Sequence, residues 1–433
     1  MYAESTPRGH GGISVIRISG THTLNIIRRI SSRNQFVPHR QGLALIRDQE
    51  GVIIDQAMIV FHPCPGSYTG EDLAEISCHG NPLVVDRIMD LLAADGLARL
   101  ARRGEFTRRA FVNGKMDLVQ AEAVGALIES MSSTGCEMAR SLLQGGLSTQ
   151  VRALREGITD LLADIEAFFI TEDEHIEGDA ILERIHPLSS IIDDLLRDAQ
   201  DSARLYEGIV TTIAGLPNVG KSSLFNAILG YDRAIVHHEE GTTRDVLREH
   251  VRLDGIDFIF HDTAGIRETS SGPEQMGIDK TMQTLQSSDL LLYVVDAREG
   301  IRPHERQWLN LAVRTIVVMN KIDLVTGSIS VDSEFLTVPI SAKNGDGIRD
   351  LMAAMGRAFH RNLTPVFLDR HLHLLQETSA NLASCRTAIR EGLTLDVVAI
   401  DLRHAAEYLS RMIGESLDED ILERIFSRFC IGK

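Results

Sequence analysis

The sequence is poor in aromatic residues and in cysteine, and it has no long apolar run. Aromatic side chains make up 5% of its 433 residues, and its five cysteines form neither a Cys-x-x-Cys pair nor a Cys/His cluster. A disulfide framework and a zinc site are therefore not indicated. Because no apolar segment approaches the roughly 20 residues of a membrane span, we expect no membrane association.

Positive charge is also scarce, because 61 Asp and Glu residues outnumber 44 Lys and Arg residues and give a formal net charge of −17 at pH 7. Such a surface repels a phosphate backbone, so we expect no DNA binding and only local contacts with RNA. One basic cluster stands out, ARLARRGEFTRR at 98–109. It either forms a solvated face or makes such a local contact. Its arginines are Arg99, Arg102, Arg103, Arg108 and Arg109.

The length of the chain indicates its number of domains, and its first residues indicate its location in the cell. A chain of this length holds roughly two to four domains. Its start, MYAESTPRGHGG, has neither the basic beginning nor the apolar core of a secretory signal. We therefore expect a cytoplasmic protein.

The hydrophobic pattern changes character along the chain. Strand-like GISVIRI and VIIDQAMIV and the helical PLVVDRIMDLLAADG predict a small α+β domain. Apolar residues at three- and four-residue spacing, as in QVRALREGITDLLADIEAFF, then predict helices, with the acidic stretch at 171–179 as a solvated connection. Strands next alternate with helices through GIVTTIAGL, DFIFHDTAG, LLLYVVDA and TIVVMNKID, before helical spacing returns.

This order predicts a multidomain α/β protein in which an α/β unit is inserted into a helical domain. Helical sequence flanks the α/β unit on both sides, and insertion at an exposed loop leaves both cores intact. We place the domain boundaries at 1–117, 118–207, 208–360 and 361–433. The first is the α+β domain, the second and fourth are the two halves of the helical domain, and the third is the α/β unit.

Residues 215–222 carry the phosphate-binding motif G-x-x-x-x-G-K-S between the apolar run IVTTIA and the helical SSLFNAIL, which is the context that the motif requires. Its glycines let backbone amides surround the phosphates, Lys221 places a charge on the β and γ oxygens, and the Ser222 hydroxyl is a Mg²⁺ ligand. The GTP-binding residues predicted in this loop are Asn218, Val219, Gly220, Lys221, Ser222 and Ser223.

Three later motifs follow in the order that a GTPase needs. DTAG at 262–265 ends an apolar strand, where an aspartate can hold the Mg²⁺ shell and a glycine amide can meet the γ-phosphate. In NKID at 320–323, Asp323 can accept both the N1 hydrogen and the exocyclic amine of guanine, a pair that adenine lacks. SAK at 341–343 completes the base pocket. The predicted GTP contacts here are Asp262, Gly265, Asn320, Lys321, Asp323, Ser341, Ala342 and Lys343.

The loop GTTRD at 241–245 is predicted to be a switch. Its threonines, Thr242 and Thr243, can complete the magnesium shell when a γ-phosphate is present, so that the loop orders on GTP and relaxes after hydrolysis.

The residue that orients the attacking water is not the usual one. Many GTPases carry a glutamine just after the DTAG glycine, whereas this sequence has Ile266. Glu268 and Glu274 in the following loop are the candidates. No arginine finger is evident, and a cation bound beside Asn218 could supply the missing positive charge.

Several long stretches resemble one family over essentially the whole chain. Besides GTTRD and DTAGIRE, they are PGSYTGEDLAEISCHGNP at 65–82, GEFTRRAFVNGKMDLVQAEAV at 104–124 and the ending FSRFCIGK at 426–433. The sequence is thus similar to MnmE, also called TrmE, the tRNA wobble-uridine modification GTPases. The resemblance implies an N-terminal domain similar to the folate-binding part of one-carbon enzymes, and a helical domain interrupted by a Ras-like P-loop G domain.

The resemblance also implies a homodimer joined through the N-terminal domains, whose G domains meet when K⁺ and GTP are bound. Glu274 would be a catalytic residue that orients the water through a bridging water. The implied Mg²⁺ ligands are Ser222 and Thr243, and the implied K⁺ ligands are Asn218, His237, Glu239 and Thr242.

The family's folate site maps to Arg17, Glu75, Lys115 and Lys433, and Cys430 is a catalytic candidate because the cysteine of this ending is needed for modification. The implied ligand is 5-formyltetrahydrofolate or 5,10-methylenetetrahydrofolate. A pterin presents an amide edge suited to a carboxylate, while its glutamate tail and formyl oxygen suit cations.

The sequence departs from the family pattern in two places. The usual TPPGRGG and ARPGEF read TPRGHGG and ARRGEF here, so that Arg8, His10 and Arg103 stand at unusual positions.

The implied function is that of a K⁺-dependent GTPase which, in a heterotetramer with a flavin-containing MnmG-like partner, adds an aminomethyl or carboxymethylaminomethyl group to C5 of the wobble uridine of certain tRNAs. The folate would provide the one-carbon unit, FAD on the partner the redox chemistry, and conversion of GTP to GDP the opening and closing of the complex.

Two alternatives are a ribosome-assembly GTPase like Era and Der and a folate enzyme regulated by GTP. Relatives of the first kind usually carry a basic tail, whereas this chain is acidic and ends in FSRFCIGK.

Overall fold

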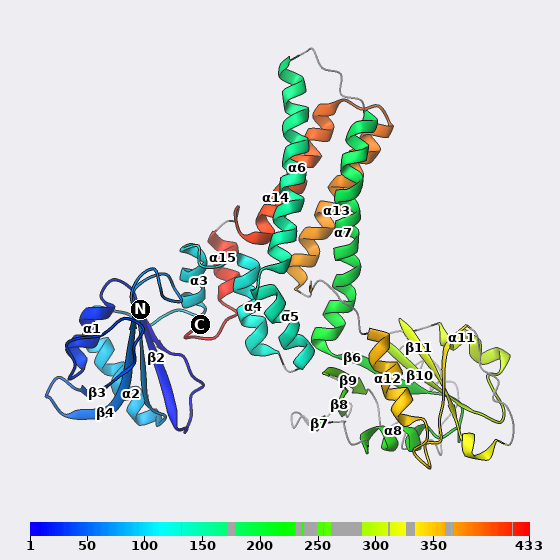
Figure 1. Cartoon of the computed structure of the whole chain (residues 1–433), viewed down its shortest axis with the longest axis horizontal. Coiled ribbons are helices and arrows are strands. Elements are labelled where there is room, and N and C mark those ends of the chain that lie inside the picture. Colours follow the sequence, from blue (N-terminus) through cyan, green and yellow to red (C-terminus); the bar gives the residue numbers. More distant parts are fainter. Residues whose placement is uncertain are drawn as a thin grey trace. The chain divides into compact units, whose positions relative to one another are not determined.

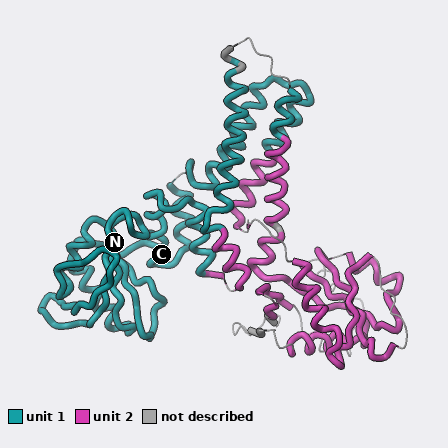
Figure 2. Tube along the Cα trace, in the orientation of Figure 1, with its two compact units in different colours: residues 1–128, 142–185, 380–433 teal, residues 129–141, 186–379 magenta. Residues whose placement is uncertain are grey.

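The computed structural model describes residues 1–130, 132–171, 178–230, 235–237, 249–253, 255–260, 288–310, 312–325, 334–359, 365, 368–417 and 419–433. It divides the chain into two compact units, which Figure 2 shows in different colours. Unit 1 comprises residues 1–128, 142–185 and 380–433, and unit 2 comprises residues 129–141 and 186–379.

The N-terminal part of unit 1 is a sheet covered by helices (Figure 1). Its strands are antiparallel and follow the order β1-β2-β5-β4-β3. Apolar side chains of α1 and α2 pack with those of the strands in one core. Strand β2, ISVIRIS, alternates buried and partly exposed residues, as expected for a sheet with one covered face. The strands are β1 Tyr2–Glu4, β2 Ile13–Ser19, β3 Gly42–Arg47, β4 Ile53–His62 and β5 Leu73–His79, and the helices are α1 Thr23–Ile30, α2 Pro82–Ala94 and α3 Glu105–Val112.

Long helices follow this sheet in the chain and return near its end. Within unit 1, α6 packs against α14, and Arg403 of α14 forms an ion pair of 2.7 Å with Glu166 of α6. Gly414 ends α14 with a φ of 87°, a left-handed conformation that favours glycine. The helices are α4 Leu118–Glu129, α5 Ser133–Leu143, α6 Gly146–Thr171, α7 Gly178–Glu207, α13 Asp369–Arg390, α14 Leu395–Ile413 and α15 Glu419–Phe426.

Unit 2 contains a mostly parallel sheet of strand order β12-β11-β10-β6-β9-β8-β7, in which only β8 and β7 run antiparallel to their neighbours. Strand β10, LLLYVVD, is buried at every position, as is typical of a parallel strand covered on both faces. The strands are β6 Ile209–Ala214, β7 Ile235–His237, β8 Glu249–Leu253, β9 Ile256–Phe260, β10 Leu290–Asp296, β11 Arg314–Asn320 and β12 Leu336–Pro339, and the helices are α8 Lys221–Leu229, α11 Arg306–Leu309 and α12 Ile348–Phe359.

The predicted element types agree with the described structure. The two N-terminal strands appear as β2 and β4, the helix expected at 82–96 appears as α2, and the strands expected after residue 208 appear as β6, β9, β10 and β11. Most of the acidic connection at 171–179 lies outside the described residues. No described helix is both long and apolar enough to cross a membrane.

Candidate functional site

The phosphate-binding loop joins the end of β6 to the start of α8 in unit 2. Two of its glycines are required by close backbone approach. Gly215 has a φ of 146°, and a Cβ there would lie 2.2 Å from the Val294 carbonyl oxygen of β10. Gly220 has a φ of 100°, and a Cβ there would lie 2.2 Å from Asn320 Nδ2. The loop therefore follows the sheet edge closely and leads into the N-terminus of α8, where backbone N–H groups can bind an anion.

Lys221 is the first residue of α8, and its ammonium group lies within the loop. Its Nζ donates hydrogen bonds to the carbonyl oxygens of Gly215 (3.0 Å) and Leu216 (2.9 Å). Burial lowers the pKa of Lys221. An ammonium group has three donors, so one remains for a phosphate oxygen, and that interaction would favour the charged form.

Asn320, at the end of β11, connects the two loops on either side of it. Its side chain is buried, with Nδ2 donating to the Val219 carbonyl oxygen at 2.8 Å and Oδ1 accepting from the Ala342 amide at 3.0 Å. The residue therefore fixes the phosphate-binding loop relative to the 341–343 loop with one of its two N–H donors and one of its two acceptor lone pairs. Its function is to position both loops.

Asp323 is exposed and is oriented by the buried Ser341. The Ser341 hydroxyl donates to Asp323 Oδ1 at 2.6 Å and accepts from the Asn344 amide at 3.3 Å. The hydroxyl thus orients the carboxylate, and each of its oxygens has a lone pair available. This arrangement can accept the two adjacent donors of a guanine edge.

A residue missed by the sequence analysis, Asp296, holds the lysine of the NKID motif. Lys321 Nζ donates to Asp296 Oδ2 at 3.0 Å and to the Asn218 carbonyl oxygen at 2.6 Å. Arg298 binds both oxygens of Asp296, at 2.9 and 2.7 Å. Hydrogen bonds from Arg298, with further ones from Lys321, lower the pKa of Asp296 against the opposing effect of burial. Its place at the end of LLLYVVDA was the available signal.

The other residues predicted for the G-domain site fall into two groups, those that the structure describes and those outside the described residues. Asn218 is exposed, with a φ of 64°, and its side-chain amide makes no hydrogen bond to the described part of the chain, so its oxygen fits a cation ligand. Ser222 and Ser223 lie in the first turn of α8, and Lys343 lies in the 341–343 loop. His237 ends β7. The residues Glu239, Thr242, Thr243, Asp262, Gly265, Glu268 and Glu274 lie outside the described residues.

In unit 1, Arg17 and Glu75 are brought together by strand register. They are direct partners on the antiparallel strands β2 and β5, and Arg17 Nε lies 2.8 Å from Glu75 Oε1. The guanidinium also lies 5.8 Å from the ring centroid of Tyr68, whose hydroxyl is 2.9 Å from Thr107 Oγ1. Tyr68 occurs in the PGSYTGED stretch but was not assigned a role from sequence. A flat polar ligand would meet a paired cation and carboxylate here.

The C-terminal residues reach the same region. The Phe106 amide donates to the Lys433 carbonyl oxygen at 3.1 Å, and the Gly104 amide donates to the Cys430 carbonyl oxygen at 3.3 Å. Burial and the nearby Arg17 lower the pKa of Lys433, against the opposite effect of Cys430 and Glu75. The structure therefore places Lys433 within electrostatic reach of Arg17 and Glu75, and the exposed Cys430 within reach of Lys433.

Lys115 follows α3 in the chain, and its side chain contacts the loop that precedes β5. Its Nζ donates to the Pro65 carbonyl oxygen at 3.0 Å, and its methylene groups lie close to Gly70, where a Cβ would be 3.3 Å from Lys115 Cγ. No contact among the described residues joins it directly to Arg17, Glu75 or Lys433. Lys115 contacts Pro65 and Gly70 of the loop 65–72, and Arg17 contacts Tyr68 of the same loop.

The departures from the family pattern lie on the surface of this region. Arg8 forms an exposed ion pair of 2.7 Å with Asp86, and His10 is exposed. Arg103 Nε donates to the Phe429 carbonyl oxygen at 2.9 Å and so supports the C-terminal tail. None of these side chains pairs with Arg17 or Glu75.

Comparison with known proteins covers the whole chain. The family model described as the MnmE helical domain matches residues 118–430, and the one described as GTP-binding protein TrmE N-terminus matches residues 1–115. The tRNA modification GTPase MnmE of Akkermansia muciniphila is 40% identical over 447 residues, covering 100% of this chain and 98% of that protein. Those of Thermosipho melanesiensis and Thermotoga maritima are each 37% identical, over 445 and 452 residues, covering 100% of this chain and 99% of theirs.

Among solved structures, the G domain of the T. maritima FeoB iron transporter is 22% identical, with a TM-score of 0.26, and covers 35% of this chain and 99% of that chain.

Proposed function

The chain belongs to the MnmE family of tRNA modification GTPases, and from that premise we propose that it is a K⁺-dependent GTPase that helps to install an aminomethyl or carboxymethylaminomethyl group at C5 of the wobble uridine of certain tRNAs. The observation that carries the GTPase part is the linkage of Asn320, Asp323 and Ser341 to the phosphate-binding loop. It joins the loop that holds Lys221 to the loops that hold Asp323 and Ser341, so that an ammonium group for phosphate and a carboxylate for guanine belong to one connected site.

In the nucleotide site, each described residue has a separate task. Asp323 selects guanine, because adenine would leave the carboxylate without its two donors. Lys221 stabilises negative charge on the β and γ oxygens, and the amides of the loop do the same. Asn320 and Asp296 hold these groups in place, so that little reorganisation is needed when charge develops.

The metal ions fit the residues available to them. Ser222 and Thr243 would hold Mg²⁺, and Asn218, His237, Glu239 and Thr242 would surround K⁺, which supplies positive charge beside the phosphates when bound. The exposed Asn218 amide, free of partners in the described part of the chain, is the observation that supports this assignment. Glu274 would orient the attacking water.

For the one-carbon chemistry, we propose that Arg17, Glu75, Lys115 and Lys433 bind 5-formyltetrahydrofolate or 5,10-methylenetetrahydrofolate. The Arg17–Glu75 pair fits a pterin edge, which offers donors to a carboxylate and an acceptor to a guanidinium. Cys430 is exposed and close enough to Lys433 to interact with it electrostatically, and it is the proposed catalytic cysteine.

The assembly proposed for this activity is a homodimer joined through the N-terminal domains, in a heterotetramer with an FAD-containing MnmG-like flavoprotein and with tRNA as substrate. Within the chain, we propose that the G domain at 208–360 is inserted into the helical domain formed by 118–207 and 361–433. The contact between α6 and α14 supports this division, because it joins helices from before and after the G domain. The ribosome-assembly alternative is not favoured, since the family match spans the whole chain.

Steady-state GTP hydrolysis in KCl and in NaCl at equal ionic strength tests the cation dependence. A large stimulation by K⁺ that Asn218→Ala removes and Asn226→Ala retains supports the proposal. Equal slow rates in both salts contradict it and would indicate a GTPase that needs an external activator. In the same assay, Glu274→Ala should abolish hydrolysis while GTP binding stays, and unchanged turnover would exclude Glu274 from the reaction.

A further inference from the structure

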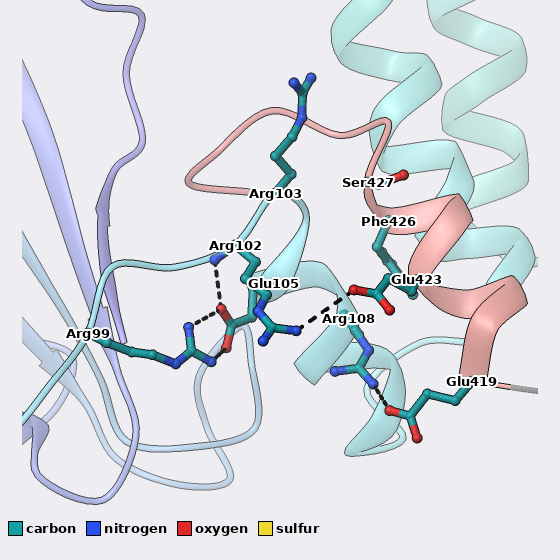
Figure 3. A pocket seen from close by; sticks show the side chains of 9 residues that line it. All are labelled: Arg99, Arg102, Arg103, Glu105, Arg108, Glu419, Glu423, Phe426 and Ser427. Carbon is teal, nitrogen blue, oxygen red and sulfur yellow. Dashed lines mark hydrogen bonds and ion pairs between the residues drawn. The ribbon is translucent and has the colours of Figure 1, made fainter.

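The basic cluster identified in the sequence lines a cavity of about 280 Å³ in unit 1, between the start of α3 and α15 (Figure 3). Four of its arginines contribute to the lining, together with Glu105 and with two glutamates of α15. No role proposed above uses this cavity. We propose that it is a phosphate-binding site for the backbone of the tRNA substrate; the inference rests on the proposed function.

The inner wall of the cavity is held rigidly. Arg99 binds both oxygens of Glu105, at 2.8 and 2.7 Å, and the Arg102 amide adds a third hydrogen bond at 2.8 Å. Arg109 donates to the same carboxylate at 2.8 Å and to Glu71 at 2.8 Å. Burial would raise the pKa of Glu105, but these hydrogen bonds outweigh it and lower the pKa to about 2. One carboxylate is thus held by two guanidinium groups, and the cavity lining as a whole has four arginines against three glutamates.

The outer wall is held loosely. Arg102 lies 3.8 Å from Glu423, and the two side chains are 76% and 69% exposed. Arg108 pairs with Glu419, whose side chain is 79% exposed, and its own Nε is buried without a hydrogen-bond partner. Exposed ion pairs of this kind contribute little stability. A phosphate diester can therefore displace the two glutamates at little cost and offers each arginine a bidentate acceptor.

The position of the cavity favours RNA as its occupant. The segment 103–106 that forms one side of it also binds the C-terminal tail, through Arg103 to Phe429, Gly104 to Cys430 and Phe106 to Lys433. An RNA strand held by Arg102 and Arg108 would thus lie beside the residues proposed to carry the one-carbon chemistry. The net charge of −17 repels RNA over most of the surface. RNA binding by this chain therefore requires a local group of arginines such as this one.

Binding of the full-length chain to an unmodified tRNA transcript, followed by fluorescence anisotropy at several salt concentrations, tests the site. Arg102→Ala with Arg108→Ala should weaken binding about tenfold and reduce the salt dependence of log Kd by about 1.5, since two phosphate contacts are lost. Arg197→Ala, which removes an equally exposed arginine paired with Asp194, is the matched control and should change neither value.

A second variant keeps the test decisive if the double alanine variant unfolds. Glu419→Gln with Glu423→Gln frees both arginines and should tighten tRNA binding, whereas damage to α15 would weaken it. Failure of the wild-type chain to bind the transcript, or equal binding by all variants, overturns the proposal. Loss of pteroyltriglutamate binding in place of tRNA binding also overturns it, because the cavity would then hold the tail of a folate.

GTP hydrolysis in KCl, measured on the same samples, separates this site from the proposed function. The double arginine variant should retain the wild-type rate, since neither side chain belongs to the nucleotide site. A K⁺-stimulated rate with no tRNA binding would overturn the cavity assignment alone.

Discussion

In the proposed guanine site, Asn320, Asp323 and Ser341 lie at or just after the ends of neighbouring parallel strands, whereas in the proposed folate site Arg17 faces Glu75 across two antiparallel strands and Lys433 comes from the far end of the chain. The first site is a set of short motifs whose order along the chain is enough to bring them together, because carboxyl ends of parallel strands share one edge. The second depends on strand register and on a tail that must be docked. Its residues carry no local pattern of their own.

This difference predicts how each site should respond to amino-acid substitutions. In the guanine site, side chains hold one another directly, as Ser341 holds Asp323 and Asp296 holds Lys321. In the folate region, Lys433 is held through backbone hydrogen bonds of the 104–106 segment, which itself depends on the buried Glu105. Substitutions should therefore separate nucleotide binding from folate binding cleanly.

The largest effect is expected for Asp323→Asn. The asparagine amide would face the donors of guanine with a donor of its own, so affinity for GTP should fall by at least about 100-fold. Xanthosine triphosphate, which has a carbonyl in place of the amine, should bind better than GTP. Titration with fluorescent nucleotides measures both, with Asp350→Asn as control. Unchanged affinity for GTP would show that Asp323 does not recognise the base. Affinity for the folate should stay the same in both variants.

Glu105→Gln should reduce the free energy of unfolding of unit 1 by about 2–3 kcal/mol at pH 7, because Arg99 and Arg109 lose their shared carboxylate. The pKa of Glu105 lies below its ordinary value of 4.5, at about 2. Its stabilisation is therefore fully present above pH 4.5 and is lost as the pH falls towards 2. Urea titrations followed by circular dichroism should show this acid dependence in the wild type and less of it in the variant. An identical pH profile would contradict the account.

Lys115→Ala should weaken binding of 5-formyltetrahydrofolate about tenfold, through loss of one charge-assisted contact. Calorimetry on the wild type, on this variant and on Arg87→Ala as an exposed control measures the effect. Affinity for GTP should stay at the wild-type value. Equal folate binding by all three proteins would remove Lys115 from the site.

The smallest effect is expected for Arg8→Ala. Its ion pair with Asp86 is exposed, with side chains 67% and 49% accessible, so stability should change by less than about 0.5 kcal/mol. Folate affinity should stay within about twofold, since Arg8 contacts no proposed ligand residue. A clear loss of folate affinity would show that this departure from the family pattern reshapes the site.

The sequence predicted the G-domain side more completely than the N-terminal side, for physical reasons. The spacing of GLPNVGKSS, NKID and SAK and the apolar strand before each motif indicate where these segments meet, and Asn320 and Ser341 make hydrogen bonds between them. Asp296 was missed because it belongs to no motif, although its place at the end of an apolar strand was a signal that it lies at the same sheet edge. Tyr68 and the cavity behind Arg102 were missed because they depend on contacts between segments more than 30 residues apart.

Reconstitution of the modification tests the central claim most directly. The chain would be combined with an FAD-containing MnmG-like flavoprotein, an unmodified tRNA, GTP, KCl, 5,10-methylenetetrahydrofolate and a nitrogen donor, and the nucleosides would be analysed by mass spectrometry. The account predicts a C5-modified wobble uridine that disappears when GTP or the folate is omitted and when Lys433 is deleted. Full modification by the chain lacking Lys433, or without added folate, would contradict it.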